Sequence, residues 1–228
     1  MLALSPRLQA VLGFCRSLHT PCGVLADIGT DHAYLPIAAV QHEVCKSAIA
    51  CDLHPGPLKI AVKNIRYAGL HERIETRLGD GLMPLSPSEC DCIVVAGMGG
   101  MRIWSIVLEG MAQAQAAKRL ILQPQHDIVL LRKNLHSAGF EIEDEQLARE
   151  VVSGKEHFYV VLAARYKGEV TAWAEREYFL GKFLIEKAGE DFTAYKACER
   201  DKIEAYIASV KDEAMLQNAK KRFEWLST

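Results

Sequence analysis

The sequence predicts an α/β protein with an open, Rossmann-like sheet of seven strands followed by a C-terminal α-helical hairpin. Up to Gly139, short apolar runs rich in Val and Ile alternate with longer amphipathic stretches. This alternation is typical of parallel strands joined by crossover helices on both faces of a sheet. The pattern changes after Gly139, and signals for further strands end at Gly168.

Five strands are expected first, with helices between them. The expected strands are Gly23–Asp27, Ser47–Cys51, Ile74–Leu78, Asp91–Ala96 and Arg119–Gln123. The expected helices are Leu35–His42, Pro55–Tyr67, Gly100–Ala116 and Asp127–Ala138. Before them, the stretch MLALSPRLQAVLGFCRSLHT has apolar residues at helical spacing, and Pro6 and Arg7 interrupt any signal-peptide pattern. We therefore expect this stretch to be part of the mature fold.

The last two strands have the pattern of an antiparallel hairpin. FEIEDEQLARE and HFYVVLAARY are joined through VVSGKE, which contains the turn residues Ser153 and Gly154. After Gly168 the chain is rich in Ala, Glu and Lys and contains no proline, which predicts two antiparallel helices broken near Gly189. The expected domains are therefore residues 1–167 and residues 168–228.

Composition restricts the possible environments of the protein. The apolar runs are far shorter than the ~18 residues that a membrane span needs. Seven scattered cysteines do not suggest a disulfide framework, and Cys90 and Cys92 have no second pair at zinc-ligand spacing. We expect buried thiols in the cytoplasm and no metal. The net charge of −2 provides no electrostatic footprint for nucleic acid by itself.

The turn after the first strand, Asp27-Ile28-Gly29-Thr30, indicates the class of cofactor. In an open parallel sheet, ligands bind at the carboxyl ends of the strands. A dinucleotide site would need three glycines there, so that backbone amides can approach a pyrophosphate. This turn has one glycine, and Asp27 and Asp31 would repel a diphosphate. Two carboxylates suit an ammonium or sulfonium ligand, which favours S-adenosylmethionine over NAD.

The next strand ends add to this prediction. Asp52, followed by Leu53, lies after the second strand, where a carboxylate can accept hydrogen bonds from both ribose hydroxyls of an adenosine. After the third strand, Asp80 is expected to accept the adenine amino proton, and Gly81 to leave room for the ring. Gly97 follows the fourth strand and completes the expected cofactor contacts.

Several of these motifs together resemble one enzyme family. ADIGTDHAYLPI, GDGL, VVAGMGGMRI, LILQPQHDIVLLRKNL and GKEHFYVV are similar to the bacterial tRNA adenine-N1 methyltransferases that modify adenine 22. The resemblance runs from LSPRLQAV to about Tyr166. It implies a class I methyltransferase domain, S-adenosylmethionine as the methyl donor, tRNA as the substrate, and a coiled-coil-like C-terminal hairpin that helps to hold tRNA.

Pro36 helps to place the residues after the first turn. Proline is tolerated in the first turn of a helix, so a helix is expected to start near Leu35 and to leave Asp31, His32 and Tyr34 in a loop over the methionine end of the donor. Asp31 is expected to stabilise positive charge on the methylated base, with His32 as a hydrogen-bond partner. Helix capping is the alternative for these two residues. Tyr34 either contacts the substrate or packs on the helix.

Gly97-Met98-Gly99-Gly100 occupies the place where many adenine amino-group methyltransferases have Asn/Asp-Pro-Pro-aromatic. The absence of the Asn/Asp-Pro-Pro-aromatic motif favours a ring nitrogen of adenine, rather than its amino group, as the methylation target. Met98, Gly99 and Gly100 are expected to provide apolar contact and space for the base, and a close-packed turn is the alternative.

Basic residues near these motifs are candidates for contact with the tRNA backbone. Arg7 and Arg102 adjoin motifs, and His126 is either a substrate contact or a simple loop residue. Further candidates, for which a solvated surface charge is the alternative, are Arg132, Lys133, Lys220, Lys221 and Arg222.

Two other functions remain open at this point. One is a methyltransferase for another RNA, a small molecule or a protein, although the sheet contains no inserted lid. The other is an RNA-binding module without activity, although Asp27, Asp52 and Asp80 are all present. A monomer is expected, with a dimer as the alternative. The sequence does not indicate which tRNA isoacceptors are substrates.

Overall fold

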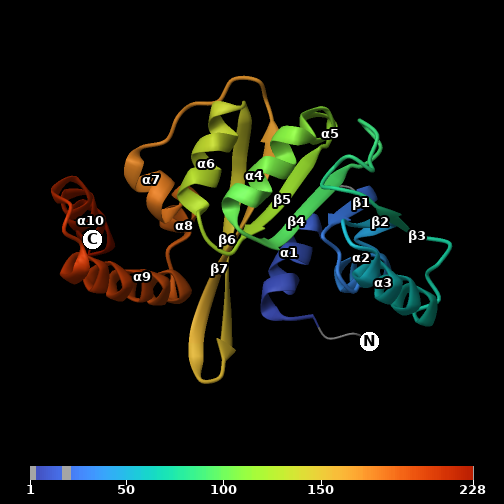
Figure 1. The fold of residues 1–228 in the computed structure, drawn as a ribbon, viewed down its shortest axis with the longest axis horizontal. Coiled ribbons are helices and arrows are strands. Elements are labelled where there is room, and N and C mark those ends of the chain that lie inside the picture. The colour runs from blue at the N-terminus through green and yellow to red at the C-terminus, as the bar shows by residue number, and fades with distance from the viewer. Residues whose placement is uncertain (1–3, 17–21, 228) are drawn as a thin grey trace. The chain divides into compact units, whose positions relative to one another are not determined.

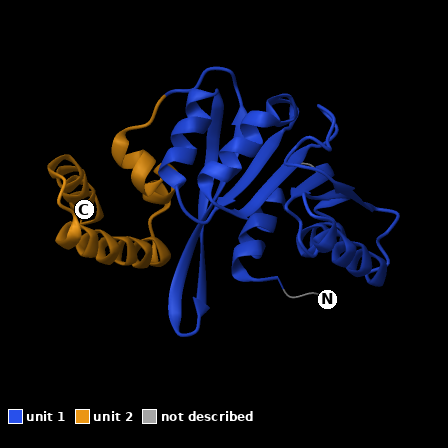
Figure 2. Ribbon diagram, viewed as in Figure 1, with its two compact units in different colours: residues 1–171 blue, residues 172–228 orange. Residues whose placement is uncertain are grey.

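The computed structural model describes residues 4–16 and 22–227 and forms two compact units, residues 1–171 and residues 172–228 (Figure 2). The remainder of the N-terminal stretch analysed above lies outside the described residues. None of the helices in the described ranges has the length and apolar character needed to cross a membrane.

The first unit is built on a seven-stranded sheet with the order β3-β2-β1-β4-β5-β7-β6. Neighbouring strands among the first five are parallel, whereas β7 is antiparallel to both β5 and β6. The predicted open sheet with a terminal hairpin is therefore confirmed. The strands are β1 (Cys22–Ile28), β2 (Cys45–Asp52), β3 (Ile74–Leu78), β4 (Cys92–Met98), β5 (Arg119–Pro124), β6 (Phe140–Val152) and β7 (Lys155–Tyr166).

Helices cover both faces of this sheet (Figure 1). α2 packs against α1 and α3, and α4 packs against α5 and α6. The core contains nearly continuous buried runs of the central strands, as expected for parallel strands that are covered on both faces. The helices are α1 (Pro6–Arg16), α2 (Tyr34–Gln41), α3 (Pro55–Tyr67), α4 (Gly100–Glu109), α5 (Met111–Ala116) and α6 (Ile128–Ser137).

α3 illustrates how local sequence sets these elements. It begins at Pro55, where the missing N–H of proline has no helical partner to lose. Its buried residues Leu58, Ala61 and Ile65 follow helical spacing and lie on one face. The predicted bounds of this helix are the observed ones.

One expected helix is two helices. The predicted segment Gly100–Ala116 is interrupted at Gly110, where α4 ends and α5 begins. A Cβ atom at Gly110 would lie 2.4 Å from Cβ of Leu82, so this position packs too closely for any other residue. Glycine is also a weak helix former, and the break therefore falls at the residue that tolerates it best.

The second unit consists of four helices rather than the two predicted. They are α7 (Glu175–Leu180), α8 (Lys182–Lys187), α9 (Glu190–Ser209) and α10 (Glu213–Ser227). Gly181, with φ of 94°, separates α7 from α8, and Gly189 separates α8 from α9. α10 starts after Asp212, whose carboxylate accepts the backbone N–H of Met215 at 2.9 Å. The hairpin is therefore formed by α9 and α10, which pack against each other.

Candidate functional site

Two cavities lie at the carboxyl ends of the parallel strands in the first unit. The larger has a volume of about 540 Å³ and the smaller about 290 Å³, and Gly29 lines both. The larger cavity is lined by Leu4, Ser5, Arg7, Leu8, Asp27, Gly29, Thr30, Asp31, His32, Tyr34, Leu35, Ala96, Gly97 and Gln125. The smaller is lined by Ile28, Gly29, Asp52, Leu53, His54, Gly79, Asp80, Gly81, Met98, Arg102 and Ile106.

Asp27, next to the last residue of β1, is a buried carboxylate beside the larger cavity. Its side chain is only 6% exposed, and its Oδ2 accepts the hydroxyl of Thr30 at 2.7 Å. The pKa of Asp27 is raised to about 6, mainly by burial; the Thr30 hydrogen bond acts in the opposite direction, and the charge of Asp52 contributes to the increase. A carboxyl group held in this way is stabilised in its charged form by a cationic ligand.

Gly29 and Met98 meet where the turn after β1 approaches the end of β4. Gly29 has φ of 74°, and a Cβ atom there would lie 2.4 Å from Cε of Met98. The single glycine of this turn is therefore needed for both its conformation and its packing. Met98, which was expected to contact the target base, lines the smaller cavity together with Asp52.

Asp52 connects the turn after β1 to the turn after β2. Its Oδ1 accepts the backbone N–H of His54 at 2.9 Å, and its Oδ2 accepts the backbone N–H of Asp31 at 3.3 Å. Each carboxylate oxygen has two lone pairs, so both oxygens retain capacity for the hydroxyls of a ribose. Leu53 is half-exposed on the rim of the same cavity.

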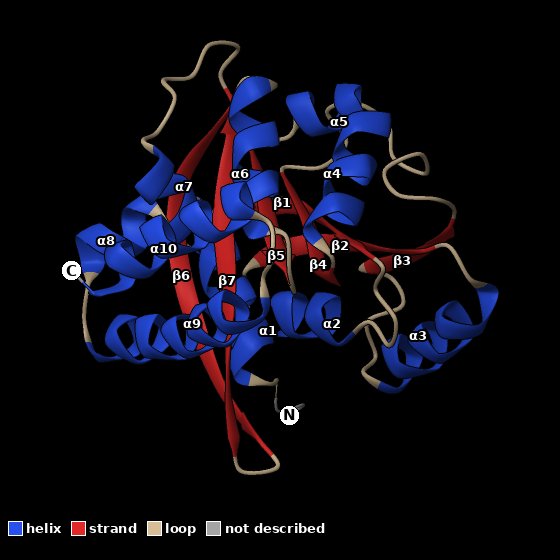
Figure 3. Cartoon of the chain, turned by 60° about the vertical axis from the view of Figure 1, so that its left-hand side comes forward, coloured by secondary structure: helices blue, strands red, loops and turns tan. Residues whose placement is uncertain are grey.

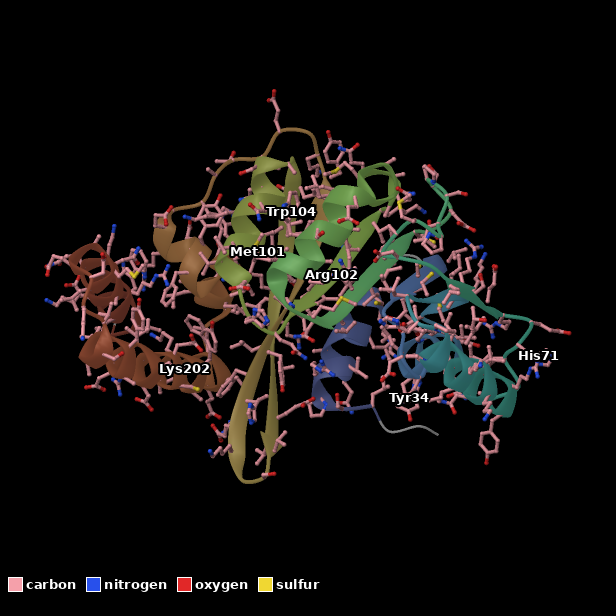
Figure 4. All side chains as sticks on the ribbon, in the orientation of Figure 1. Tyr34, His71, Met101, Arg102, Trp104 and Lys202 are labelled. Carbon is pink, nitrogen blue, oxygen red and sulfur yellow. The ribbon has the colours of Figure 1, made fainter. Side chains whose placement is uncertain are left out.

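Asp80 and Arg102 form an ion pair at the smaller cavity, with Oδ1 and Nη2 2.7 Å apart. Arg102 projects from the first turn of α4 (Figure 4). Gly81 has φ of 51°, and a Cβ atom there would lie 3.2 Å from Ile106. Sequence reasoning missed Ile106, although its position on the apolar face of a predicted helix was visible.

The loop after β1 and the first residue of α2, Tyr34, present three side chains to the larger cavity. Asp31 is 67% exposed, and its Oδ2 lies 3.4 Å from Nε2 of His32. The His32 ring lies 5.3 Å from the Tyr34 ring, between centroids. Asn64 donates a hydrogen bond to the His32 carbonyl at 2.9 Å, which fixes the loop to α3. Within the described residues, Nδ1 of His32 is buried and has no hydrogen-bond partner.

This loop does not cap α2. The helix begins at Tyr34, one residue before the expected start, and its N-cap is Ala33, with no side-chain hydrogen bond. Asp31 and Ala33 both have positive φ, of 51° and 59°. Such a conformation is uncommon for residues other than glycine and is typical of binding loops that the surrounding structure holds in place.

Arg7 lies at the larger cavity and is held by side chains of β5 and β6. Its Nη1 donates a hydrogen bond to Oε1 of Gln123 at 3.2 Å, and its backbone N–H donates to Glu150 at 2.9 Å. Its guanidinium lies 5.6 Å from the centre of the Tyr159 ring. Gln123 is fully buried and also accepts the backbone N–H of Gly97 at 3.1 Å. Sequence reasoning missed Gln123, although a Gln inside the apolar run LILQP was a detectable signal.

Gly99 and Gly100 allow the loop after β5 to approach α4. A Cβ atom at Gly99 would lie 2.5 Å from the His126 ring, and one at Gly100 would lie 2.7 Å from the carbonyl oxygen of Asp127. The N–H of Gly100 donates to the His126 carbonyl at 2.9 Å. His126 is exposed, with Nδ1 2.7 Å from a carboxylate oxygen of Asp127. These two glycines and His126 are not among the residues that line the two cavities.

Arg132 was expected at the surface but is completely buried. It forms a 2.7 Å ion pair with the equally buried Glu145 of β6, so the proposed contact of this arginine with RNA is wrong. A buried charge needs a partner of opposite charge. Glu145 lies in a strand outside the helix that contains Arg132, so the residue pattern of the helix did not reveal it.

The site is built for binding and positioning. The pKa of the Cys51 thiol is raised to about 12, mainly by burial and also by the charge of Asp27, so this thiol is protonated at neutral pH and is a poor nucleophile. Among the described residues, no group of three or more His, Cys, Asp and Glu side chains is arranged to hold a metal ion. Two buried carboxylates at neighbouring strand ends, with the exposed carboxylate of Asp31, favour a cationic nucleoside ligand and a reaction that develops positive charge.

Comparisons with known proteins agree with this geometry. The profile of the tRNA (adenine(22)-N(1))-methyltransferase family matches residues 25–226. The chain is 39% identical over 150 residues to the tRNA (adenine(22)-N(1))-methyltransferase of Bacillus subtilis, a match that spans 65% of this chain and 61% of that protein. A Streptococcus pneumoniae protein solved in complex with S-adenosyl-L-methionine is 33% identical, with a TM-score of 0.86 and coverage of 99% of this chain and 98% of that one. The TrmK protein of M. capricolum, solved with S-adenosyl-homocysteine, is 26% identical, with a TM-score of 0.78 and coverage of 98% and 96%.

Proposed function

Because the chain belongs to the tRNA (adenine(22)-N(1))-methyltransferase family, we propose that it transfers a methyl group from S-adenosyl-L-methionine to N1 of adenine 22 in tRNA. The observation that supports this most strongly is the pair of buried carboxylates, Asp27 and Asp52, at the carboxyl ends of neighbouring parallel strands. This is the position at which open α/β sheets bind ligands.

The residues at the two cavities fit the methyl donor. Asp27, with its pKa raised by burial, favours a positively charged ligand, and the donor has both an ammonium and a sulfonium group. Asp52 would accept the ribose hydroxyls, and Asp80 with Gly81 would bind the adenine. Ile28, Gly29, Thr30, Leu53 and Gly97 line the remaining donor site. When bound, the donor supplies a methyl group activated by its positively charged sulfur.

The acceptor requires little acid–base chemistry from the protein. Adenine N1 has an in-plane lone pair that attacks without loss of a proton, so the main task is alignment of the base. The methylated base is cationic, and the exposed carboxylate of Asp31 at the larger cavity would stabilise this developing charge. His32 would donate or accept a hydrogen bond through its buried, unpartnered Nδ1.

Other residues would hold the tRNA around the base. Tyr34 offers a half-exposed ring at the larger cavity, and Arg7 offers a guanidinium there. Arg102, Met98, Gly99, Gly100 and His126 surround the end of β4 and the loop after β5, and are proposed as further substrate contacts. The helices of the second unit are proposed to bind the tRNA body, with the protein acting as a cytoplasmic monomer.

Mass spectrometry of nucleosides provides the direct test. Unmodified tRNA is incubated with the protein and S-adenosylmethionine, digested and analysed, and the modified position is mapped. We expect 1-methyladenosine at position 22 and none when adenine 22 is replaced by guanine. Donor binding without any methylation of tRNA would contradict the proposal and would favour a different acceptor.

A further inference from the structure

The hairpin of β6 and β7 extends beyond the rest of the sheet (Figures 1 and 3). β5 pairs with β7 only at Leu162, Ala163 and Ala164, whereas the β6–β7 pairing continues to Val152 and Lys155. The outer half of the hairpin therefore has no neighbouring strand beyond its own two. Its outer edges are therefore not paired with any other strand of the sheet.

One face of this outer half leads away from the larger cavity. Side chains at alternate positions of a strand point to the same face, so Tyr159, His157 and Lys155 lie in a row. Tyr159 packs against the core cluster that includes residues of α1, and the Arg7 guanidinium lies over its ring. His157 and Lys155 are exposed. The row therefore runs from Arg7, which lines the cavity, to the tip of the hairpin.

The chemistry of this row matches single-stranded RNA. The rings of His157 and Tyr159 are nearly parallel, with an interplanar angle of 16° and centroids 6.5 Å apart. Parallel aromatic rings provide a platform on which bases stack, and neighbouring cations bind phosphates. Arg7 and Lys155 supply cations at the two ends of the row. No carboxylate among the described residues forms an ion pair with either of them.

The acidic residues of the hairpin do not neutralise the positive charge of Arg7 and Lys155. Glu150, opposite His157 on β6, accepts the backbone N–H of Arg7 and so helps to hold the row together. Glu156 lies between Lys155 and His157 in the strand, so it points to the opposite face, where it pairs with Arg149. The face with Arg7, His157 and Lys155 therefore has more positive than negative groups.

We propose that the row of Arg7, Tyr159, His157 and Lys155 binds the tRNA strand that flanks the target adenine. This inference rests on the proposed function. A base whose N1 is to be methylated has to leave its stack, and its neighbours lose a stacking partner when it does. The rings of the hairpin replace that partner beside the cavity, and the cations hold the adjacent phosphates.

The test uses the full-length protein and measures tRNA affinity at several salt concentrations, together with donor affinity. His157→Ala is expected to weaken tRNA binding about tenfold, the scale for loss of one stacked base. His157→Trp should restore it, because it retains a ring. Lys155→Ala should reduce the slope of log affinity against log salt by about one, as loss of one phosphate contact does. Donor affinity should stay within about twofold of wild type in all three variants.

The matched control is His71→Ala combined with Lys46→Ala. These residues are exposed and lie near the amino ends of the parallel strands, away from the cavities. The control should bind tRNA as the wild type does. Hairpin variants whose tRNA affinity and salt slope equal those of the control would overturn the proposed surface alone. A wild-type protein that binds the donor but not tRNA would overturn the proposed function as well, so the two failures are distinguishable.

Discussion

The side-chain oxygen of Gln123 accepts a hydrogen bond from the guanidinium of Arg7 at 3.2 Å, although 116 residues separate the two in sequence. The same oxygen accepts the backbone N–H of Gly97 at 3.1 Å, and the Gln123 amide donates to the Pro124 carbonyl at 2.8 Å. One buried amide thus fixes a cation at the larger cavity and the turn after β4 at the same time.

Gln123→Leu should therefore affect both stability and tRNA use. Removal of the oxygen leaves the Gly97 N–H without its acceptor, which should lower the free energy of unfolding by about 1–3 kcal/mol. It also releases Arg7, so kcat/KM for tRNA should fall more than donor affinity. Gln123→Glu retains an acceptor for both groups and should recover most of the activity. An unchanged kcat/KM in the Leu variant would show that the position of Arg7 is unimportant.

The sequence predicts the fold well because the sheet arises from local patterns. Alternating strands and helices determine that the carboxyl ends of β1 and β2 meet, and this places Asp27 and Asp52 together. The helix breaks were less predictable. Gly110 breaks a helix because Leu82 packs against it, and the end of α9 contains neither glycine nor proline.

The site residues that the sequence did not reveal depend on partners far away in the chain. Gln123 acquires its role from Arg7, and Arg132 is buried because Glu145 of another element neutralises it. Gly99 and Gly100 were expected to provide space for the base. Their close contacts are instead with the loop after β5. Spacing within one segment contains no information about such contacts.

Asp27 should lower the stability of the free protein near neutral pH. Its folded-state pKa of about 6 lies above the ordinary 3.8, so the folded protein retains a proton that the unfolded chain has already lost. The contribution of this group to the free energy of unfolding is therefore largest below about pH 3.8. It falls as the pH rises to about 6 and stays low at higher pH. Asp27→Asn should raise the free energy of unfolding at pH 8 by up to about 3 kcal/mol. Chemical denaturation of the free protein at pH 4 and pH 8 tests this.

The same substitution should weaken donor binding. A cationic donor favours the charged form of Asp27, so wild-type affinity should rise from pH 5 to pH 7 as the carboxyl group loses its proton. Asp27→Asn should bind the donor more weakly and with little dependence on pH in this range. Calorimetric titrations of both proteins at several pH values measure the effect. Equal pH dependence in the two proteins would assign the titration to another group.

Asp52→Ala should weaken donor binding by about 1–3 kcal/mol, the scale for lost hydrogen bonds to a charged group. The variant also loses the acceptor for the N–H groups of Asp31 and His54, so melting temperatures have to be compared at the same time. Asp52→Asn retains one acceptor oxygen, enough for one of these two N–H groups, and serves as a partial control for loop structure. If Asp52→Ala binds the donor as tightly as the wild type does, another residue must contact the ribose.

Removal of residues 172–228 should leave a folded first unit. The N–H groups of Lys167 and Gly168 both donate to the Gly139 carbonyl, so a cut after Thr171 preserves the end of the sheet domain. The truncated protein should bind the donor normally and methylate tRNA at least tenfold more slowly at limiting tRNA. A methylation rate equal to that of the full chain would restrict the helical unit to a role in stability.

Asp31→Asn distinguishes a catalytic carboxylate from a binding one. If Asp31 stabilises the positive charge that develops on the base, the substitution should reduce the methyl-transfer rate on the order of a hundredfold. Asn has the same size and still accepts a hydrogen bond, and the Asp31 backbone N–H that binds Asp52 is unaffected. Donor affinity should therefore change little. If Asp31 instead contacts the donor ammonium, the substitution should weaken donor binding, and saturating donor should restore the rate.

Single-turnover rates at saturating donor, measured beside donor affinity, separate these outcomes. A helix-capping role, which would leave both quantities near wild type, does not fit the structure, because Ala33 is the N-cap of α2 and no side chain caps it. The exposed position of Asp31 predicts that stability changes by less than about 0.5 kcal/mol. His32→Gln provides a second comparison, since its side chain retains hydrogen-bonding capacity at the larger cavity but not the imidazole ring. If the saturated rate of Asp31→Asn equals that of wild type, the carboxylate is not catalytic, and the charge on the base is met by the backbone carbonyls of residues 97–99 or by solvent.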